Sequence, residues 1–184
     1  MITDIKFAKV DPNAIIPSKK DEDMGFDIYA CFDEDYIIMK PNETKLIPTG
    51  IASACDPEYG FVLRERGSTG SKGIALRAGV IDSGYRGPWF IGLTNTSNRW
   101  LIISKVDVED VINNEIKQID GENILTINYV TRCIENAIVY PYSKAIAQAL
   151  VVPVPKVEIE EISYDELKSI KSERGTGELG SSNK

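Results

Sequence analysis

The sequence predicts an all-β domain, and three observations support this fold class. Short apolar stretches recur along most of the 184-residue chain with a period of two, as in strands whose side chains alternate between two faces. Turn sequences separate these stretches, for example at residues 11–13, 40–42 and 56–57. Proline residues stand at their ends, where a missing amide donor costs least. Many short strands at this spacing indicate a β-sandwich or β-barrel.

Each expected strand follows from its own apolar stretch. The strands are expected, in chain order, at residues 2–7, 26–31, 36–39, 46–54, 61–63, 89–94, 100–106, 124–130, 137–140 and 146–154. One short helix is expected near the C-terminus, because Ser163 and Glu166 form a capping box before an apolar helical face. Residues 172–184 are rich in glycine and serine, which predicts a flexible C-terminal arm after a single domain of residues 1–171.

The composition narrows the possible chemistry. The chain contains no histidine and carries a net charge of −7. Without histidine, a Ser-His-Asp or Cys-His catalytic site and a His-containing zinc site are excluded. An enzyme with this composition would use a carboxylate base, and its metal would be a hard ion held by oxygen. The acidic balance provides no attraction for a nucleic-acid backbone, so no nucleic-acid partner is expected.

The cysteines and the apolar stretches predict the cellular setting. Cys31, Cys55 and Cys133 are far apart and form no CxxC pair, so we expect free thiols in a reducing compartment. No apolar stretch approaches the length of a membrane span. The first residues lack a basic and apolar signal region. We therefore expect a cytoplasmic protein with no membrane partner.

Residues 64–86 depart from the acidic balance of the chain. They hold five basic residues against two acidic ones, together with several glycines. Basic side chains and the exposed amides of glycine turns suit a phosphate chain. A solvated surface loop with ordinary turn glycines is the alternative interpretation. The segment lacks the GxxxxGK[ST] spacing, so a P-loop kinase is not predicted.

Two further features accompany this segment. Residues 174–177 form a second basic and glycine-rich cluster that could close over an anionic ligand, with a disordered terminus as the alternative. Asp82 follows an apolar stretch and precedes a turn, where a carboxylate could activate water. A hydrogen bond within the turn is the alternative role for this aspartate. The two basic clusters in an acidic β domain indicate a small polyanion as the ligand.

Five segments resemble, in order, the five motifs of the trimeric dUTPase family. They are residues 24–30 (MGFDIYA), 66–72 (RGSTGSK), 79–87 (GVIDSGYRG), 145–149 (AIAQA) and 174–182 (RGTGELGSS). The resemblance implies a jelly-roll-like β fold and a magnesium-dependent enzyme that hydrolyses dUTP to dUMP and pyrophosphate. It also implies a homotrimer with sites at the subunit interfaces. The implied roles in the cell are to keep uracil out of DNA and to supply dUMP for dTMP synthesis.

The resemblance assigns a role to each matching residue. Asp82 would orient the water that attacks the α-phosphorus, and Asp27 would lie near the magnesium ion through water. Tyr85 would pack against the deoxyribose and leave no room for a 2′-hydroxyl. The other implied substrate-binding residues contact the uracil edge (Gly79, Val80, Ile81) or the phosphates (Arg66, Gly67, Ser68, Gln148, Arg174), or belong to the closing arm (Leu179, Gly180, Ser181).

Four positions depart from the motifs of the family. Gly67 stands in place of a serine, Ala145 in place of an arginine, Leu179 in place of a phenylalanine that stacks on uracil, and Gly84 in place of an aspartate that many members carry. Leucine can cover a base but lacks the stacking interaction of an aromatic ring.

The third and fourth motifs are separated by an insertion, at approximately residues 96–136, similar to one in some phage members. A surface hairpin is one interpretation, and a subdomain that binds a regulatory protein is the other. Two alternative functions follow from the resemblance. The scaffold could serve as a regulatory protein-binding module, or the chain could be a dCTP deaminase, which shares the fold. The second is disfavoured because Gly92 stands where the deaminases have a catalytic glutamate.

Overall fold

The computed structural model describes residues 4–119, 124–173 and 175–176. It divides the chain into two compact units, Met1–Val154 and Pro155–Lys184, and each is described by itself. In the described part of the chain, no helix has the length and apolar character needed to cross a membrane.

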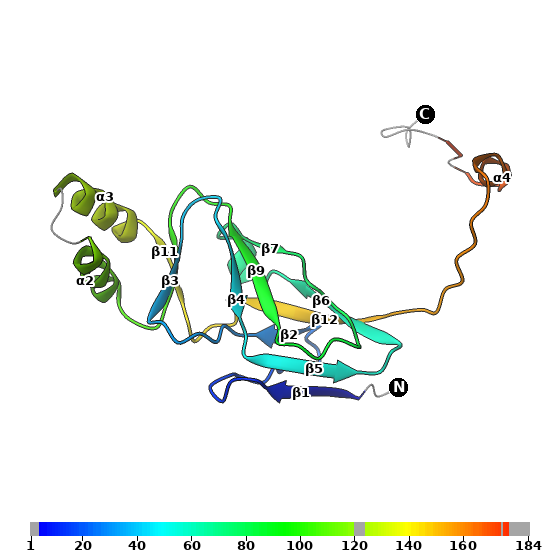
Figure 1. Cartoon of the computed structure of the whole chain (residues 1–184), viewed down its shortest axis with the longest axis horizontal. Coiled ribbons are helices and arrows are strands. Elements are labelled where there is room, and N and C mark those ends of the chain that lie inside the picture. Colours follow the sequence, from blue (N-terminus) through cyan, green and yellow to red (C-terminus); the bar gives the residue numbers. More distant parts are fainter. Residues whose placement is uncertain (1–3, 120–123, 174, 177–184) are drawn as a thin grey trace. The chain divides into compact units, whose positions relative to one another are not determined.

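Four small sheets build the first unit (Figure 1). Their strand orders are β1-β5, β11-β10-β3, β2-β12-β6-β8 and β4-β9-β7. Among the described strands, β10 and β11 pair in parallel and the other neighbours pair antiparallel. The strands are β1 (Ile5–Lys9), β2 (Gly25–Ile28), β3 (Tyr36–Met39), β4 (Thr44–Pro48), β5 (Ile51–Cys55), β6 (Tyr59–Arg64), β7 (Ile74–Arg77), β8 (Val80–Ile81), β9 (Phe90–Asn95), β10 (Leu101–Ser104), β11 (Ile138–Pro141) and β12 (Ala147–Pro153).

All four sheets bury side chains in one core, which makes the first unit a single β domain. Ile51, Met39, Phe61 and Ile91 each come from a different sheet and are at most 1% exposed. Trp89 is fully buried beside Phe61, with ring centroids 5.0 Å apart in an edge-on arrangement. The predicted all-β fold class is therefore confirmed within this unit.

Strand β10 is buried on both faces, and this explains a second, smaller core. Leu101 and Ile103 face the main core, whereas Trp100 and Ile102 face two helices. The helices are α2 (Val108–Gln118) and α3 (Ile124–Glu135), which lie together at one end of the domain (Figure 1). Near-continuous apolar sequence is typical of a strand covered on both sides.

The expected strand at residues 124–130 is wrong, because this segment begins helix α3. Its β-branched residues favour a strand locally. However, Val130, Cys133, Ile134 and Ala137 all pack in the second core. Their spacing is helical, so burial against β10 overrides the local preference. The insertion consequently holds β10 and the helices α2 and α3, so the surface-hairpin interpretation is wrong, and the predicted single short helix understates the helical content.

Two other expectations change in detail. The expected strand at residues 46–54 is divided into β4 and β5 at Thr49 and Gly50, where Gly50 has a φ of 66°. The elements α1 (Gly67–Gly70), β7 and β8 were not predicted, because they lie in the basic, glycine-rich segment 64–86, which was interpreted as loops.

The second unit contains the one helix that the sequence predicted. Helix α4 (Tyr164–Ser169) starts at Ser163, whose Oγ accepts the Glu166 amide at 3.2 Å. A reciprocal hydrogen bond is present, since Glu166 Oε2 accepts from the Ser163 amide at 2.8 Å. The predicted capping box is confirmed. The hydroxyl and amide of Ser163 also lower the pKa of the Glu166 carboxyl.

Candidate active site

A polar pocket of about 670 Å³ brings together residues from distant parts of the chain. Strand β12 lies between β2 and β6, and its Gln148 pairs with Asp27 on one side and with Arg64 on the other. The pocket is lined by residues from three of the predicted motifs and from the segment before β12: Asp23, Met24, Gly25, Asp27, Tyr29, Arg66, Gly67, Ser68, Ser143, Lys144, Ala145 and Gln148. We call it the phosphate pocket.

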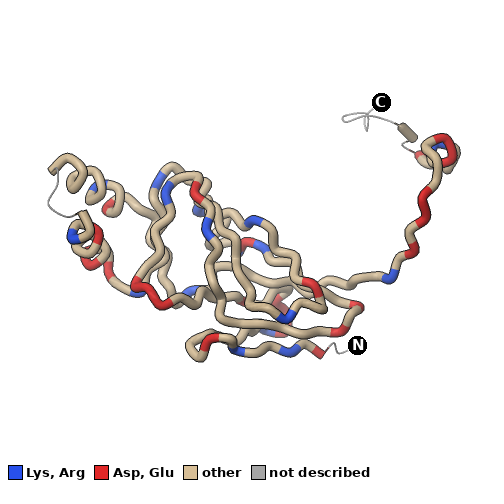
Figure 2. The backbone as a smooth tube through the Cα atoms, in the orientation of Figure 1, with Lys and Arg blue, Asp and Glu red and all other residues tan. Residues whose placement is uncertain are grey.

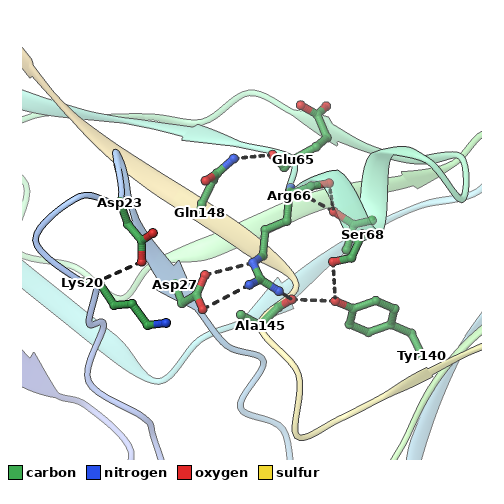
Figure 3. Close-up of polar contacts among 10 residues, drawn as sticks. Lys20, Asp23, Asp27, Glu65, Arg66, Ser68, Tyr140, Ala145 and Gln148 are labelled. Atoms are coloured by element: carbon green, nitrogen blue, oxygen red, sulfur yellow. Dashed lines mark hydrogen bonds and ion pairs between the residues drawn. The ribbon is translucent and has the colours of Figure 1, made fainter.

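Arg66 is held in this pocket from three directions (Figure 3). Its Nε lies 2.9 Å from Asp27 Oδ1, and its Nη2 donates to Asp27 Oδ2 at 3.2 Å. Its Nη1 donates to the Ala145 carbonyl at 3.3 Å. A guanidinium has five N–H donors, so two of them remain for a ligand. Bidentate pairing with Asp27 fixes the plane of the group that would face a phosphate.

Gln148 is oriented by the backbone of the neighbouring strand. Its Nε2 donates to the Glu65 carbonyl at 2.8 Å, which leaves the second hydrogen of the amide for another acceptor. On the opposite side, a Cβ added at Gly25 would lie 2.7 Å from Gln148 Oε1. Glycine at this position is therefore needed for the side chain to lie as it does.

Helix α1 is a single turn that presents the next residues of the motif to the pocket. Buried Thr69 stabilises this turn, since its Oγ1 accepts a hydrogen bond from the Arg66 amide at 3.0 Å. The amides of Gly67 and Ser68 are the first of this turn and have no partner within it. Ser68 Oγ lies 3.5 Å from the hydroxyl of Tyr140, a buried residue that the sequence did not indicate.

A second, smaller pocket of about 290 Å³ contains the third motif. The predicted residues Gly79, Val80, Ile81, Asp82 and Tyr85 all line it, and we call it the hairpin pocket. The remaining lining residues are Leu46, Arg77, Ala78, Pro88, Phe90 and Gly92. Much of this surface is apolar and accessible, because the side chains of Val80 and Phe90 are 73% and 45% exposed. Such a surface suits a flat base and a sugar.

The backbone of the hairpin is held in an unusual conformation. Ala78 has a φ of 59° and Gly79 a φ of 118°. A left-handed conformation is unfavourable for alanine, and strained backbone of this kind gathers at functional sites. The Gly79 carbonyl accepts the Leu63 amide at 2.7 Å, which fixes the start of the hairpin on β6.

Tyr85 and Arg86 complete the turn that carries Asp82. The Asp82 carbonyl accepts the Tyr85 amide at 3.1 Å, so the carboxylate itself is not used to close the turn. The Tyr85 hydroxyl donates to the Pro88 carbonyl at 3.0 Å. Arg86 Nη1 donates to the carbonyls of Ser83 and Tyr85 at 2.5 and 3.0 Å. The side chain of Asp82 is exposed to solvent.

Asp82 and Arg66 lie toward opposite ends of β6, although Gly79 of the hairpin pocket contacts Leu63 near the Arg66 end. Val62 pairs with Val80 and Phe61 with Ile81, so the register brings Asp82 opposite Gly60. Strand β6 ends at Arg64 and Arg66 lies just beyond that end, so most of the strand separates Asp82 from Arg66. The structure thus brings together Asp27, Arg66, Gly67, Ser68 and Gln148 in one pocket and the third-motif residues in the other. The arm residues Arg174, Leu179, Gly180 and Ser181 lie outside the described residues.

The pockets offer few direct ligands for a metal ion. In the part of the chain that the structure describes, no three Cys, Asp or Glu side chains gather closely enough to hold one. Both oxygens of Asp27 already contact Arg66, but each has a further lone pair that can accept from a water molecule. This fits Mg²⁺, which usually keeps several waters and is held by substrate phosphates with one or two carboxylates.

Glu65 connects the end of β6 to β7, two strands that belong to different sheets. Its Oε1 accepts the Leu76 amide at 2.8 Å. This bond, the amide of Glu65 itself and the nearby Arg64 and Arg77 hold the pKa of the Glu65 carboxyl below its ordinary value. Because the pKa is lowered in the folded state, the charged form contributes stability at neutral pH.

We expect Glu65→Gln to lower the free energy of unfolding at pH 7 by about 1 kcal/mol, since the bond to Leu76 loses its charge. This deficit should shrink as the pH falls through the lowered pKa of Glu65, where the unmodified protein also loses the charge. Urea unfolding at several pH values measures both effects. A deficit that stays constant down to pH 3 would contradict this role of Glu65.

Comparison with known proteins decides the family. The family model described as dUTPase matches residues 11–108. A deoxyuridine 5'-triphosphate nucleotidohydrolase from Nautilia profundicola is 31% identical over 184 residues, which covers 98% of this chain and 99% of the relative. The chain belongs to the dUTPase family. A relative of the same name from Leptospira interrogans is 35% identical over 99 residues, covering 52% of this chain and 68% of the relative.

Solved structures of phage dUTPases share the fold. The dUTPase of Staphylococcus bacteriophage 80alpha with dUPNHPP superposes with a TM-score of 0.68 at 22% identity, covering 98% of this chain and 99% of the phage chain. The dUTPase of phage phi11 of S. aureus, which has a species-specific insert, has a TM-score of 0.59 at 18% identity and covers 86% and 96%. The predicted family, the jelly-roll-like β fold and the enzyme class, a dUTP diphosphatase, are therefore confirmed.

Proposed function

We propose that the chain hydrolyses dUTP to dUMP and pyrophosphate, with Asp82 as the base that activates water for attack on the α-phosphorus. The observation that carries this proposal is the division of the motif residues into two complementary pockets. One is polar and centred on Arg66, and the other is apolar with the exposed carboxylate of Asp82 at its edge. A triphosphate and a nucleoside are the two halves of such a substrate. Membership of the dUTPase family supports the same activity.

The hairpin pocket is proposed to select the nucleoside. The backbone of Gly79, Val80 and Ile81 would read the uracil edge through its N–H and C=O groups. Tyr85 would pack against the deoxyribose, and its hydroxyl bond to Pro88 would hold the ring in place. A Cβ on Gly87 would collide with the Tyr85 ring, so the small residue maintains this arrangement. A 2′-hydroxyl would then meet the ring, which favours deoxyribose.

The phosphate pocket is proposed to bind the triphosphate. In the proposed complex, the phosphate oxygens would accept hydrogen bonds from several donors of this pocket. These donors are the two remaining N–H groups of Arg66, the amides of Gly67 and Ser68 and the second Nε2 hydrogen of Gln148. Asp27 would hold Mg²⁺ through water, and the ion would neutralise charge on the phosphate oxygens. Asp82 would take the proton of the attacking water, a task for which its exposure and its free carboxylate suit it.

The separation of Asp82 from Arg66 supports sites at subunit interfaces, and the family resemblance makes a homotrimer the proposed assembly. Within one chain, Asp82 and Arg66 are divided by most of β6. A second copy that brings its hairpin pocket to the phosphate pocket of the first would close this distance. Mixing Asp82→Asn chains with Arg66→Lys chains, each of which has reduced activity alone, tests this proposal. Partial recovery of dUTP hydrolysis supports it, and mixed oligomers that show no recovery would contradict it.

The C-terminal arm is included in this proposal. Arg174 would bind the terminal phosphate while Leu179, Gly180 and Ser181 close over the nucleotide. A chain that ends at residue 171 should then keep its oligomeric state and lose most of its activity. Full activity of the shortened chain would contradict a closing arm.

Substrate selection is the direct test of the proposed activity. The chain is incubated with magnesium and one of five substrates, which are dUTP and the four common deoxynucleoside triphosphates. Pyrophosphate release is measured for each. We expect release from dUTP alone. Equal release from dTTP or dCTP, or ammonia release from dCTP as in a deaminase, would contradict the proposal. The proposed roles in the cell, removal of dUTP and supply of dUMP, follow from this reaction.

The insertion supports a second candidate function, binding of a regulatory protein. On α3, the side chain of Ile124 is 71% exposed, although α3 packs on the domain through Val130, Cys133 and Ile134. Acidic residues are found on α2 beside it (Figure 2). A chain with Ile124→Ser should keep dUTP hydrolysis and lose a protein that the unmodified chain retains from its host lysate. Identical retention by both chains would contradict this function.

A further inference from the structure

We propose that Tyr140 is a positioning residue of the phosphate pocket. Its hydroxyl holds the Ala145 carbonyl against the Arg66 guanidinium and lies 3.5 Å from the Ser68 hydroxyl (Figure 3). Tyr140 is 1% exposed on β11, directly after the insertion and outside all five motif segments. This inference rests on the proposed function and adds to it a residue that controls phosphate affinity from behind the pocket wall.

The Ala145 carbonyl is the point where two hydrogen bonds meet. The Tyr140 hydroxyl donates to it at 2.7 Å, and Arg66 Nη1 donates to it at 3.3 Å. A carbonyl oxygen has two lone pairs, so both donors can be satisfied together. The short bond from buried Tyr140 fixes the direction of the oxygen, which then fixes the third anchor of Arg66 beside the two Asp27 oxygens.

The same hydroxyl determines which way the Ser68 proton points. A phenol has a single proton, and that of Tyr140 is directed to Ala145. The contact between Ser68 Oγ and the Tyr140 oxygen, at 3.5 Å, is therefore one in which Ser68 donates. At this distance the contact is weak, so the Ser68 hydroxyl is able to turn to a phosphate oxygen.

A purely structural role makes a different prediction. The Tyr140 ring belongs to the main core, and the Lys72 ammonium lies 5.4 Å from its centre. Phenylalanine would fill almost the same volume. If Tyr140 only packs in the core, Tyr140→Phe should therefore leave ligand binding at the phosphate pocket unchanged. Ligand affinity at the phosphate pocket consequently separates the two roles.

The test is Tyr140→Phe in the full chain, with inhibition of dUTP hydrolysis by two ligands as the readout. Inorganic pyrophosphate probes the phosphate pocket, and deoxyuridine probes the hairpin pocket. We expect pyrophosphate to inhibit dUTP hydrolysis about five-fold more weakly, as the loss of one hydrogen bond implies, and deoxyuridine inhibition to be unchanged. Tyr36→Phe is the matched control, since Tyr36 donates to Glu115 Oε1 at 2.9 Å in the second core. It should leave both inhibition constants unchanged.

A double-mutant cycle with Ser68→Ala tests the contact between the two residues. The double variant should weaken pyrophosphate inhibition by less than the product of the two separate fold-changes, because both residues belong to one hydrogen-bond network. Unchanged pyrophosphate inhibition in Tyr140→Phe, equal weakening of both inhibitors, or loss of the fold would overturn the inference. An unmodified chain without dUTP turnover would instead overturn the proposed function.

Discussion

Asp82→Asn is expected to lower kcat for dUTP by about 10²–10⁴-fold, the usual contribution of a general base. Asparagine has nearly the same shape but cannot take a proton from water. The turn should be preserved, because Tyr85 donates to the backbone carbonyl of residue 82 and not to the carboxylate. KM should change little, since the uracil edge and the phosphates contact other groups. Steady-state kinetics with magnesium measures both constants.

Asp56→Asn is the matched control for this substitution. Asp56 is also an exposed turn aspartate, and its Oδ1 accepts the Glu58 amide at 2.9 Å. It lines neither the phosphate pocket nor the hairpin pocket. This variant should keep full activity. An Asp82→Asn protein that retains more than about a tenth of the original kcat would argue that another group activates the water.

Arg66→Lys is expected to reduce kcat/KM for dUTP by at least about 30-fold. Lysine keeps the charge but lacks the planar fork, so it cannot contact both Asp27 oxygens and the Ala145 carbonyl together. The two donors proposed for the triphosphate are lost with that geometry. We expect weaker pyrophosphate inhibition as well, whereas deoxyuridine inhibition should not change.

Arg132→Lys on α3 serves as the control, because Arg132 is an exposed arginine outside both pockets. It should match the unmodified protein in kcat/KM and in thermal stability. If Arg66→Lys retained normal kcat/KM, positive charge alone would be sufficient at this position. The bidentate arrangement with Asp27 would then have no part in binding the phosphates.

The β framework was predictable because its strands carry their own signals. The expected strand at residues 36–39 coincides with β3, and the capping box of α4 follows from Ser163 and Glu166 alone. Helix α3 was not predictable in this way. Its β-branched residues favour a strand, and only the second core formed with Trp100 and Ile102 makes the helix the better solution. Tertiary burial, which a local period cannot reveal, decides such a segment.

The candidate site shows the same division. Motif residues such as Asp27, Arg66 and Gln148 were expected from the sequence, and the register of β2, β12 and β6 brings them together. Tyr140 was not expected, since a tyrosine in an apolar strand resembles any core residue. Its role depends on a hydroxyl contact with Ala145, five positions away across a turn. The role of Tyr140 can be recognised only when the positions of β11 and β12 in the fold are known.

The most direct test of the account is hydrolysis of dUTP in ¹⁸O-labelled water. Mass spectrometry of the products locates the labelled oxygen. Attack by activated water on the α-phosphorus predicts one labelled oxygen in dUMP, none in pyrophosphate, and no labelled product from Asp82→Asn on the same time scale. Label in pyrophosphate, or labelled dUMP formed at the normal rate without the Asp82 carboxylate, would contradict the account.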